Sequence, residues 1–189
     1  MTTEIKQSAR ARLLAAADEL FYAEGVQTVG IDRVIEHAGV AKASLYNTFG
    51  SKENLVEAYL EGRHRATMDR LRRAADQHSD PKQRLLAVFD AQAELFADPG
   101  FHGCAFVSAS AEAPDGGLIA RATDEYRAEI LGLFTGLARD AGASEPAVLG
   151  RQLQLLFDGG GLAAQMDHDP AVAATAKAAA ALLVDVATG

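Results

Sequence analysis

The sequence predicts an all-α protein of about nine helices, with a small N-terminal head followed by a larger helical body. Two observations carry this prediction. Apolar residues recur at intervals of three and four along most of the chain, as on one face of a helix. No segment shows the alternation of apolar and polar residues that is typical of a half-buried strand. At 189 residues the chain is long enough to bury a sizeable core, in one domain or two.

The head contains three predicted helices with clear ends. The first covers about residues 7–24 and stops at Gly25, and the second covers residues 31–38 and stops at Gly39. Glycine is favoured there because it tolerates the left-handed backbone that commonly ends a helix. A third short helix covers about residues 42–49. The last two are joined by a tight turn, which predicts a helix-turn-helix.

The third helix has an outward face that suits DNA. Leu45 and Phe49 are predicted to point inward, and no outward position is acidic. Such a face offers a cation, small side chains, and hydroxyl and amide groups that can bond phosphates or base edges in a major groove. An ordinary helical hairpin with a polar face is the alternative from spacing alone. The outward residues are Lys42, Ala43, Ser44, Tyr46, Asn47 and Thr48.

A long fourth helix and five further helices are predicted after the head. Ser51 is a good N-cap for the fourth, and Asp80 followed by Pro81 is a strong start for the fifth. Ser144 is predicted to cap the eighth, with Pro146 in its first turn. The predicted ranges are 51–77, 80–96, 102–112, 119–141, 144–167 and 170–187.

The head resembles the TetR/AcrR-type transcriptional regulators over residues 8 to about 60. The residues that carry the resemblance are Phe21, Gly25, Ala38-Gly39-Val40, Lys42, Leu45-Tyr46, Phe49, Ser51-Lys52-Glu53 and Leu55. Beyond them the chain is similar to the family only in length and helical character, plus the stretch GCAFVSASAEAPD at residues 103–115, which looks like one subgroup.

This resemblance implies a function and a domain organisation. Residues 1–52 would form the DNA-binding domain and residues 53–189 the effector-binding and dimerisation domain, linked by helix 51–77. The protein would be a bacterial, ligand-responsive repressor that binds a palindromic operator as a homodimer, with half-sites about one turn apart, ~10 base pairs, or a multiple of that. The DNA-binding residues implied are Thr28, Lys42, Ala43, Ser44, Tyr46, Asn47, Thr48 and Lys52.

One position departs from the family pattern. Val29-Gly30 stands where the family usually has a pair of hydroxyl residues that cap the second helix and bond a phosphate. Gly30 caps only weakly, so Thr28 would have to supply any phosphate contact.

The body would hold an effector pocket and a dimer interface. The pocket candidates are the body's large apolar and aromatic residues, each of which could equally be ordinary core: Phe89, Phe96, Phe106, Tyr126, Phe134, Phe157 and Met166. The interface candidates follow one stripe on each of the last two helices, part of which could instead pack within the subunit: Leu149, Leu153, Leu156, Gly160, Ala163, Val172, Ala176, Ala179 and Leu183. The glycine run 159–161 is unusual within a helix, and close packing at a two-fold axis or a kink beside a cavity are rival explanations.

The distribution of charge and the cysteine content restrict which molecules the body can bind and where the protein is located. The net charge is −8, but residues up to Ala75 contain 11 basic and 10 acidic residues, whereas the remainder contains 7 and 16. The acidic surplus therefore lies in the body, which argues against a nucleic-acid contact there and mildly against an anionic effector. An apolar effector of unknown identity is the resulting expectation. The single cysteine, Cys104, and the lack of a signal peptide or membrane span favour a cytoplasmic protein.

Catalytic and metal-binding alternatives are weak. A Cys-His nucleophile is suggested by five residues that lie close in sequence, but no third group to orient it is evident: His102, Cys104, Ser108, Ser110 and Glu112. Neither the pair His102 and Cys104 nor residues 167–169 offer enough ligands for a closed metal site. No cofactor, metal or catalytic residue is predicted, and a redox role for Cys104 is a hypothesis only. The remaining alternative is a helical enzyme or protein-interaction module that does not use its helix-turn-helix.

Overall fold

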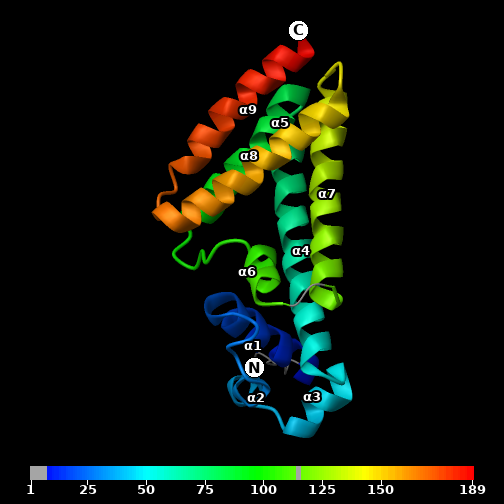
Figure 1. Cartoon of the computed structure of the whole chain (residues 1–189), viewed down its shortest axis with the longest axis vertical. Coiled ribbons are helices and arrows are strands. Elements are labelled where there is room, and N and C mark those ends of the chain that lie inside the picture. The colour runs from blue at the N-terminus through cyan, green and yellow to red at the C-terminus, as the bar shows by residue number, and fades with distance from the viewer. Residues whose placement is uncertain (1–7, 114–115) are drawn as a thin grey trace, which may run out of the picture. The chain divides into compact units, whose positions relative to one another are not determined.

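The computed structural model describes residues 8–113 and 116–189, and within them it contains nine α-helices and no strand (Figure 1). The predicted all-α fold is confirmed. The predicted helix start at Gln7, and Pro114 and Asp115 of the loop after the sixth helix, lie outside the described residues. The helices are α1 (Ala9–Glu24), α2 (Ile31–Ala38), α3 (Lys42–Phe49), α4 (Lys52–Asp76), α5 (Pro81–Phe96), α6 (Ala105–Glu112), α7 (Leu118–Asp140), α8 (Pro146–Asp167) and α9 (Val172–Thr188).

The chain forms two compact units, and neither is a single stretch of sequence. The first contains residues up to Arg63 together with Ala105–Thr123, and the second contains His64–Cys104 and Asp124–Gly189. The domain boundary predicted from the sequence lies after residue 52 and leaves α6 in the body. The structure instead groups α6 and the first turns of α7 with the head, because long-range contacts hold them there.

The first unit is built around α1, which packs on both α2 and α3. Leu13, Val34 and Leu45, one from each of these helices, are fully buried. The Phe21 ring meets the Tyr59 ring of α4 edge-on, with 5.6 Å between ring centroids. This shared apolar core fixes the orientation of α3 within the unit.

The helix ends of the first unit follow the sequence signals. The N–H of Ala11 donates to the Ser8 hydroxyl at the start of α1, and the N–H of Asn54 donates to the Ser51 hydroxyl at the start of α4. Gly39 has a φ of 59° in the left-handed region and ends α2, as predicted. A short left-handed turn of this kind lets α3 begin three residues later at an angle to α2.

The second unit has an aromatic core between its long helices. The Phe134 ring on α7 lies 5.8 Å from that of Phe89 on α5 and 5.7 Å from that of Phe157 on α8. Helix α9 packs along both α5 and α8, which Figure 1 shows running beside it. At the start of α5, the Asp80 carboxylate accepts a hydrogen bond of 2.8 Å from the N–H of Gln83, so the predicted cap is confirmed.

Two predicted helix starts in the second unit, and one in the first, differ from the structure. Helix α6 begins at Ala105 rather than residue 102, and α9 begins at Val172 rather than residue 170. Glu145 occupies the N-cap position of α8 without a side-chain hydrogen bond. Ser144, the predicted cap, instead donates its backbone N–H to the carbonyl of Ala187 at 3.0 Å. A tertiary contact with the end of α9 thus uses the residue that local sequence rules assigned to capping.

Two glycines on α7 and α8 are in opposite environments. A Cβ added at Gly150 would lie 2.5 Å from the Thr135 hydroxyl oxygen and 3.0 Å from the Thr135 backbone, so this glycine lets α8 approach α7 closely. A Cβ added at Gly132 would meet nothing within 4 Å. A glycine-to-alanine substitution therefore tests helix propensity at Gly132 and the packing of α7 against α8 at Gly150.

We expect Gly132→Ala to raise the free energy of unfolding by about 1 kcal/mol, because alanine is the better helix former. Gly150→Ala gains the same propensity but forces α7 and α8 apart, with an overpacking cost of about 1–3 kcal/mol. Urea unfolding followed by circular dichroism would measure both changes. Equal effects of the two substitutions would contradict the close approach at Thr135.

Candidate nucleic-acid interface

The outward face of α3 is accessible over its whole length. Lys42, Ala43, Asn47 and Thr48 are exposed, the Tyr46 side chain is 46% exposed, and Ser44 is half-buried. The Thr48 hydroxyl donates to the carbonyl of Ser44 at 2.6 Å, one turn earlier. All six predicted α3 positions therefore lie on one surface that a nucleic acid could reach.

The opposite face of α3 anchors the helix. Leu45 is fully buried and Phe49 is nearly so. The Asn54 side-chain amide donates to the carbonyl of Phe49 at 2.7 Å and ties the end of α3 to α4. The guanidinium of Arg10 lies 5.6 Å from the centre of the Phe49 ring. These contacts hold the outward face of α3 in one orientation relative to the rest of the first unit.

Acidic side chains pair with the basic residues around this surface. The Lys42 ammonium lies 2.7 Å from Asp32 Oδ1, and this hydrogen bond raises the pKa of Lys42 above its ordinary value. Arg33 pairs with Glu24, and His37 Nε2 lies 2.9 Å from Glu19 Oε2. The sequence of α3 has no outward acid, as predicted, but α2 contributes one that was not predicted. The spacing of residues along either helix could not reveal this pair, because it depends on how α2 and α3 pack against each other.

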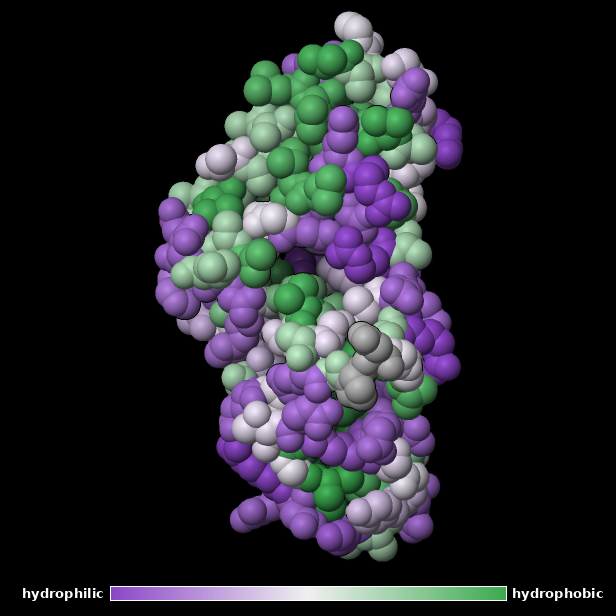
Figure 2. Space-filling model, viewed as in Figure 1, coloured by the Kyte–Doolittle hydropathy of each residue, from purple (hydrophilic) through white to green (hydrophobic). Residues whose placement is uncertain are grey.

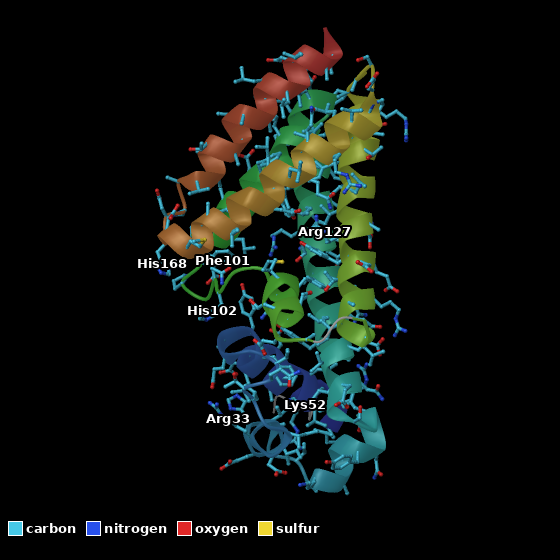
Figure 3. The ribbon with its side chains drawn as sticks, viewed as in Figure 1. Arg33, Lys52, Phe101, His102, Arg127 and His168 are labelled. Atoms are coloured by element: carbon cyan, nitrogen blue, oxygen red, sulfur yellow. The ribbon has the colours of Figure 1, made fainter. Side chains whose placement is uncertain are left out.

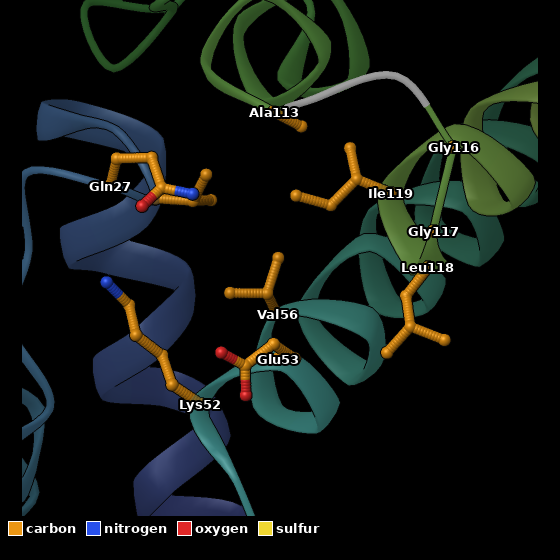
Figure 4. A pocket seen from close by; sticks show the side chains of 10 residues that line it. Gln27, Lys52, Glu53, Val56, Ala113, Gly116, Gly117, Leu118 and Ile119 are labelled. Carbon is orange, nitrogen blue, oxygen red and sulfur yellow. The ribbon is translucent and has the colours of Figure 1, made fainter.

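Thr28 and Lys52 complete the predicted DNA-binding set. Thr28 is exposed in the turn between α1 and α2, and Lys52 is half-buried at the first position of α4. Lys52 also lines a cavity of about 290 Å³ whose wall includes Val26, Val56 and Ile119. Figure 4 shows Lys52 and Gln27 on one side of this cavity and Ile119 on the other. Lys52 thus combines a partly buried stem with a cationic end near the N-terminus of α4.

A carboxylate from α6 supports the turn before α2. Glu112 Oε2 accepts a hydrogen bond of 2.7 Å from the backbone N–H of Gln27, although the two residues are 85 positions apart. Gly25, which has a φ of 94°, lies directly against the same carboxylate. From the sequence, Glu112 was only a member of a weak catalytic cluster, and nothing near it in sequence indicated this support of the turn.

Six of the seven predicted pocket residues are buried, and one is not. Phe106 lies in the first unit, whereas Phe89, Phe96, Tyr126, Phe134 and Phe157 lie in the second. Burial raises the pKa of Tyr126, so its phenol stays neutral. Met166 is 70% exposed and therefore cannot line an enclosed pocket, which corrects that prediction. Arg127, which is labelled in Figure 3, also belongs to the second unit. Its guanidinium forms an ion pair with the Asp158 carboxylate at 2.9 Å.

Four predicted interface residues are buried inside the subunit. They are Leu149, Leu153, Gly160 and Ala176. A second subunit cannot reach them, so they form core instead. A Cβ added at Gly160 would lie 3.4 Å from the Gln92 side chain and 3.5 Å from Ala176, so part of the glycine run serves packing within the subunit. The other five, Leu156, Ala163, Val172, Ala179 and Leu183, are half-buried.

A different set of apolar side chains is exposed on the last two helices. Val148, Leu155, Leu162 and Met166 recur at intervals of seven and four on α8, and Leu182 and Val186 are exposed on α9. We call these six residues the α8–α9 face. Figure 2 shows apolar side chains gathered over these two helices. Exposed apolar side chains that gather on a surface in this way are typical of a protein interface.

Neither a group of metal ligands nor a helix suited to cross a membrane occurs in the part of the chain that the structure describes. No three histidine, cysteine, aspartate or glutamate side chains converge there in a way that could hold a metal ion. No helix within residues 8–113 and 116–189 is both long and apolar enough to cross a membrane.

Comparison with known proteins places the chain in a family. Residues 13–59 match the family model described as "Bacterial regulatory proteins, tetR family". The solved structure of a TetR-family transcriptional regulator from Streptomyces coelicolor is 34% identical, covers 96% of each chain and superposes with a TM-score of 0.90. A putative TetR-type regulator from Streptomyces avermitilis is 33% identical, with a TM-score of 0.85 over 96% of this chain and 98% of that one.

Curated relatives agree with this assignment over part of their length. The HTH-type transcriptional regulator TtgR of Pseudomonas putida is 34% identical over 56% of this chain and 55% of its own. The HTH-type transcriptional repressor NemR of Escherichia coli is 30% identical over 61% of this chain and 59% of its own. The chain thus aligns with little more than half the length of these relatives. With the helix-turn-helix geometry and the full-length structural match, the chain belongs to the TetR family of bacterial transcriptional regulators.

Proposed function

We propose that this protein is a sequence-specific DNA-binding repressor that releases its operator when a small molecule binds. The observation that carries the proposal is the outward face of α3, where six accessible residues without a carboxylate lie opposite a buried apolar face. A helix presented in this way fits a major groove, with Tyr46 and Asn47 near base edges. Lys52 at the start of α4 and the exposed Thr28 would bond phosphates and set the register.

We infer that the α8–α9 face joins two copies of this chain into a cytoplasmic homodimer. Its six apolar side chains are exposed in the subunit. Burying them in a dimer would contribute a favourable free energy of about 25 cal/mol for each Å² of apolar surface removed from water. A two-fold dimer presents two α3 helices and reads a palindromic operator, with half-sites about one helical turn apart, ~10 base pairs, or a multiple of that.

The effector class is inferred from the body. The aromatic core around Phe134 is apolar, and the acidic surplus of the chain lies in residues 76–189. An apolar or weakly cationic molecule would suit these surroundings better than an anion. The buried neutral phenol of Tyr126 supplies one polar group that could orient such a molecule.

The test is selection of bound genomic fragments by the purified protein near physiological salt, followed by footprinting. We expect a discrete protected palindrome. Tyr46→Ala and Lys52→Ala should each weaken binding to that duplex by about tenfold or more, which corresponds to about 1.4 kcal/mol. Arg139→Ala removes an exposed cation from the last turn of α7 and serves as the matched control, with no expected change.

Two outcomes would contradict the proposal. One is that no fragment is enriched, even after the protein is unfolded, stripped of small molecules and refolded. The other is that Tyr46→Ala and Lys52→Ala bind selected DNA as well as the Arg139 variant does. Either result would favour a helical enzyme or interaction module that does not use its helix-turn-helix.

A further inference from the structure

An acidic side chain lies at the edge of the surface proposed to face DNA. Asp32 is the second residue of α2, and its Oδ1 is 2.7 Å from the ammonium of Lys42, the first residue of α3. Both side chains are open to solvent, at 77% and 59% exposure. A carboxylate there is unexpected on electrostatic grounds, because it repels the phosphates that Lys42 would attract.

The Asp32–Lys42 pair contributes little to the stability of the fold, so its main effect is expected on DNA binding. Ion pairs between exposed side chains stabilise a fold weakly because water and salt screen them. Neither residue belongs to the buried core of the first unit. The arrangement therefore has few consequences for folding and direct consequences for the charge and position of Lys42.

We propose that Asp32 is a specificity-determining residue that acts through Lys42; this inference rests on the proposed function. A free lysine on this face would bind any phosphate, and such contacts raise affinity for all sequences alike. Asp32 holds the ammonium and offsets its charge, so non-operator DNA gains little from Lys42. On the operator, the other contacts of α3 supply the affinity, and Lys42 stays directed by Asp32 instead of moving to the nearest phosphate.

The neighbouring charges support a local role for Asp32. Arg33 is paired with Glu24, and His37 lies against Glu19, so α2 offers few free cations. Glu36 lies one turn after Asp32 on α2 and is exposed. Among the described residues no ion pair or hydrogen bond of its side chain is found, and Lys42 is paired with Asp32 instead. Glu36→Gln is therefore a matched control that removes one negative charge from α2 without freeing Lys42.

The experiment compares Asp32→Asn with Glu36→Gln on two duplexes. One is the operator recovered by the genomic selection, and the other is a 30-base-pair duplex of random sequence. We expect Asp32→Asn to bind the random duplex about fivefold more tightly for each subunit that contacts it, the size of one charge pair at contact distance in water. Its gain on the operator should be smaller, so the ratio of operator to random affinity falls.

Two further measurements separate this mechanism from a general change in charge. Freeing Lys42 to neutralise one phosphate should steepen the dependence of log affinity on log salt on the random duplex by about 0.9 for each subunit that contacts it. In a Lys42→Gln background, Asp32→Asn should change the slope and the ratio no more than Glu36→Gln does, as a double-mutant cycle would reveal. Thermal unfolding of each variant would establish that the head remains folded.

The outcomes distinguish this inference from the proposed function. If the wild-type protein selects no operator, the proposed function fails. If an operator is found but Asp32→Asn matches Glu36→Gln, or keeps its effect without Lys42, the role of Asp32 is overturned while DNA binding stands. A reduced specificity ratio that depends on Lys42 supports the inference.

Discussion

Replacing Leu155 with aspartate is expected to produce a folded monomer that no longer binds operator DNA. Leu155 lies in the middle of the apolar stripe on α8, and its side chain is 63% exposed in the subunit. Its replacement thus leaves the subunit core intact. In a dimer that buries this face, two carboxylates would enter an apolar interface without partners, which costs several kcal/mol and weakens dimerisation by at least ~100-fold.

Sedimentation of the variant over a range of protein concentrations would measure the loss of dimer. DNA binding should fall with it, because one head makes only half of the operator contacts. Ala128→Asp is the matched control, since it adds the same charge at an exposed position of α7 outside the α8–α9 face. A Leu155→Asp protein that remains dimeric would place the interface elsewhere.

Replacing Gly25 with alanine is expected to destabilise the first unit by about 3 kcal/mol. Gly25 has φ 94° and ψ 151°, a region of backbone space that is essentially restricted to glycine and costs other residues about 1–3 kcal/mol. An added Cβ would also lie 2.3 Å from the carboxylate of Glu112. The carboxylate would have to move and lose its hydrogen bond to the N–H of Gln27, a contact worth about 1 kcal/mol.

A second substitution separates these two contributions. In a Glu112→Ala background the space beside Gly25 is open, so Gly25→Ala should cost only its backbone strain. We expect the loss in the free energy of unfolding to shrink by about 1 kcal/mol, as measured by urea unfolding of all four proteins. Strictly additive losses would mean that Glu112 does not support the turn between α1 and α2.

Local sequence signals accounted for most of the helices. Ser51 caps α4, Asp80 and Pro81 start α5, and Gly39 ends α2. These signals succeed because each depends on a hydrogen bond or backbone angle within a few residues. The prediction for Ser144 failed: Glu145 holds the N-cap position of α8, and the backbone N–H of Ser144 donates to the Ala187 carbonyl at the end of α9. No local rule contains that contact.

Some features of the candidate site, too, could be predicted from the sequence, and others could not. The helical period alone put Lys42, Tyr46 and Asn47 outward and Leu45 and Phe49 inward, as the exposures show. The period also marked the stripes on α8 and α9, but it could not tell which side of each helix meets α5. The structure places Leu149 and Leu153 in the core and leaves Leu155 exposed.

By itself, the sequence determined that the protein is all-helical and that its head carries an exposed recognition helix, because periodicity and caps act over a few residues. Only the tertiary structure decided three further features: that α6 belongs with the head, that Glu112 holds the turn at Gln27, and that Asp32 meets Lys42. The physical reason is the same for all three. Each depends on where packing brings residues from different helices, and the spacing of residues along one helix carries no information about that.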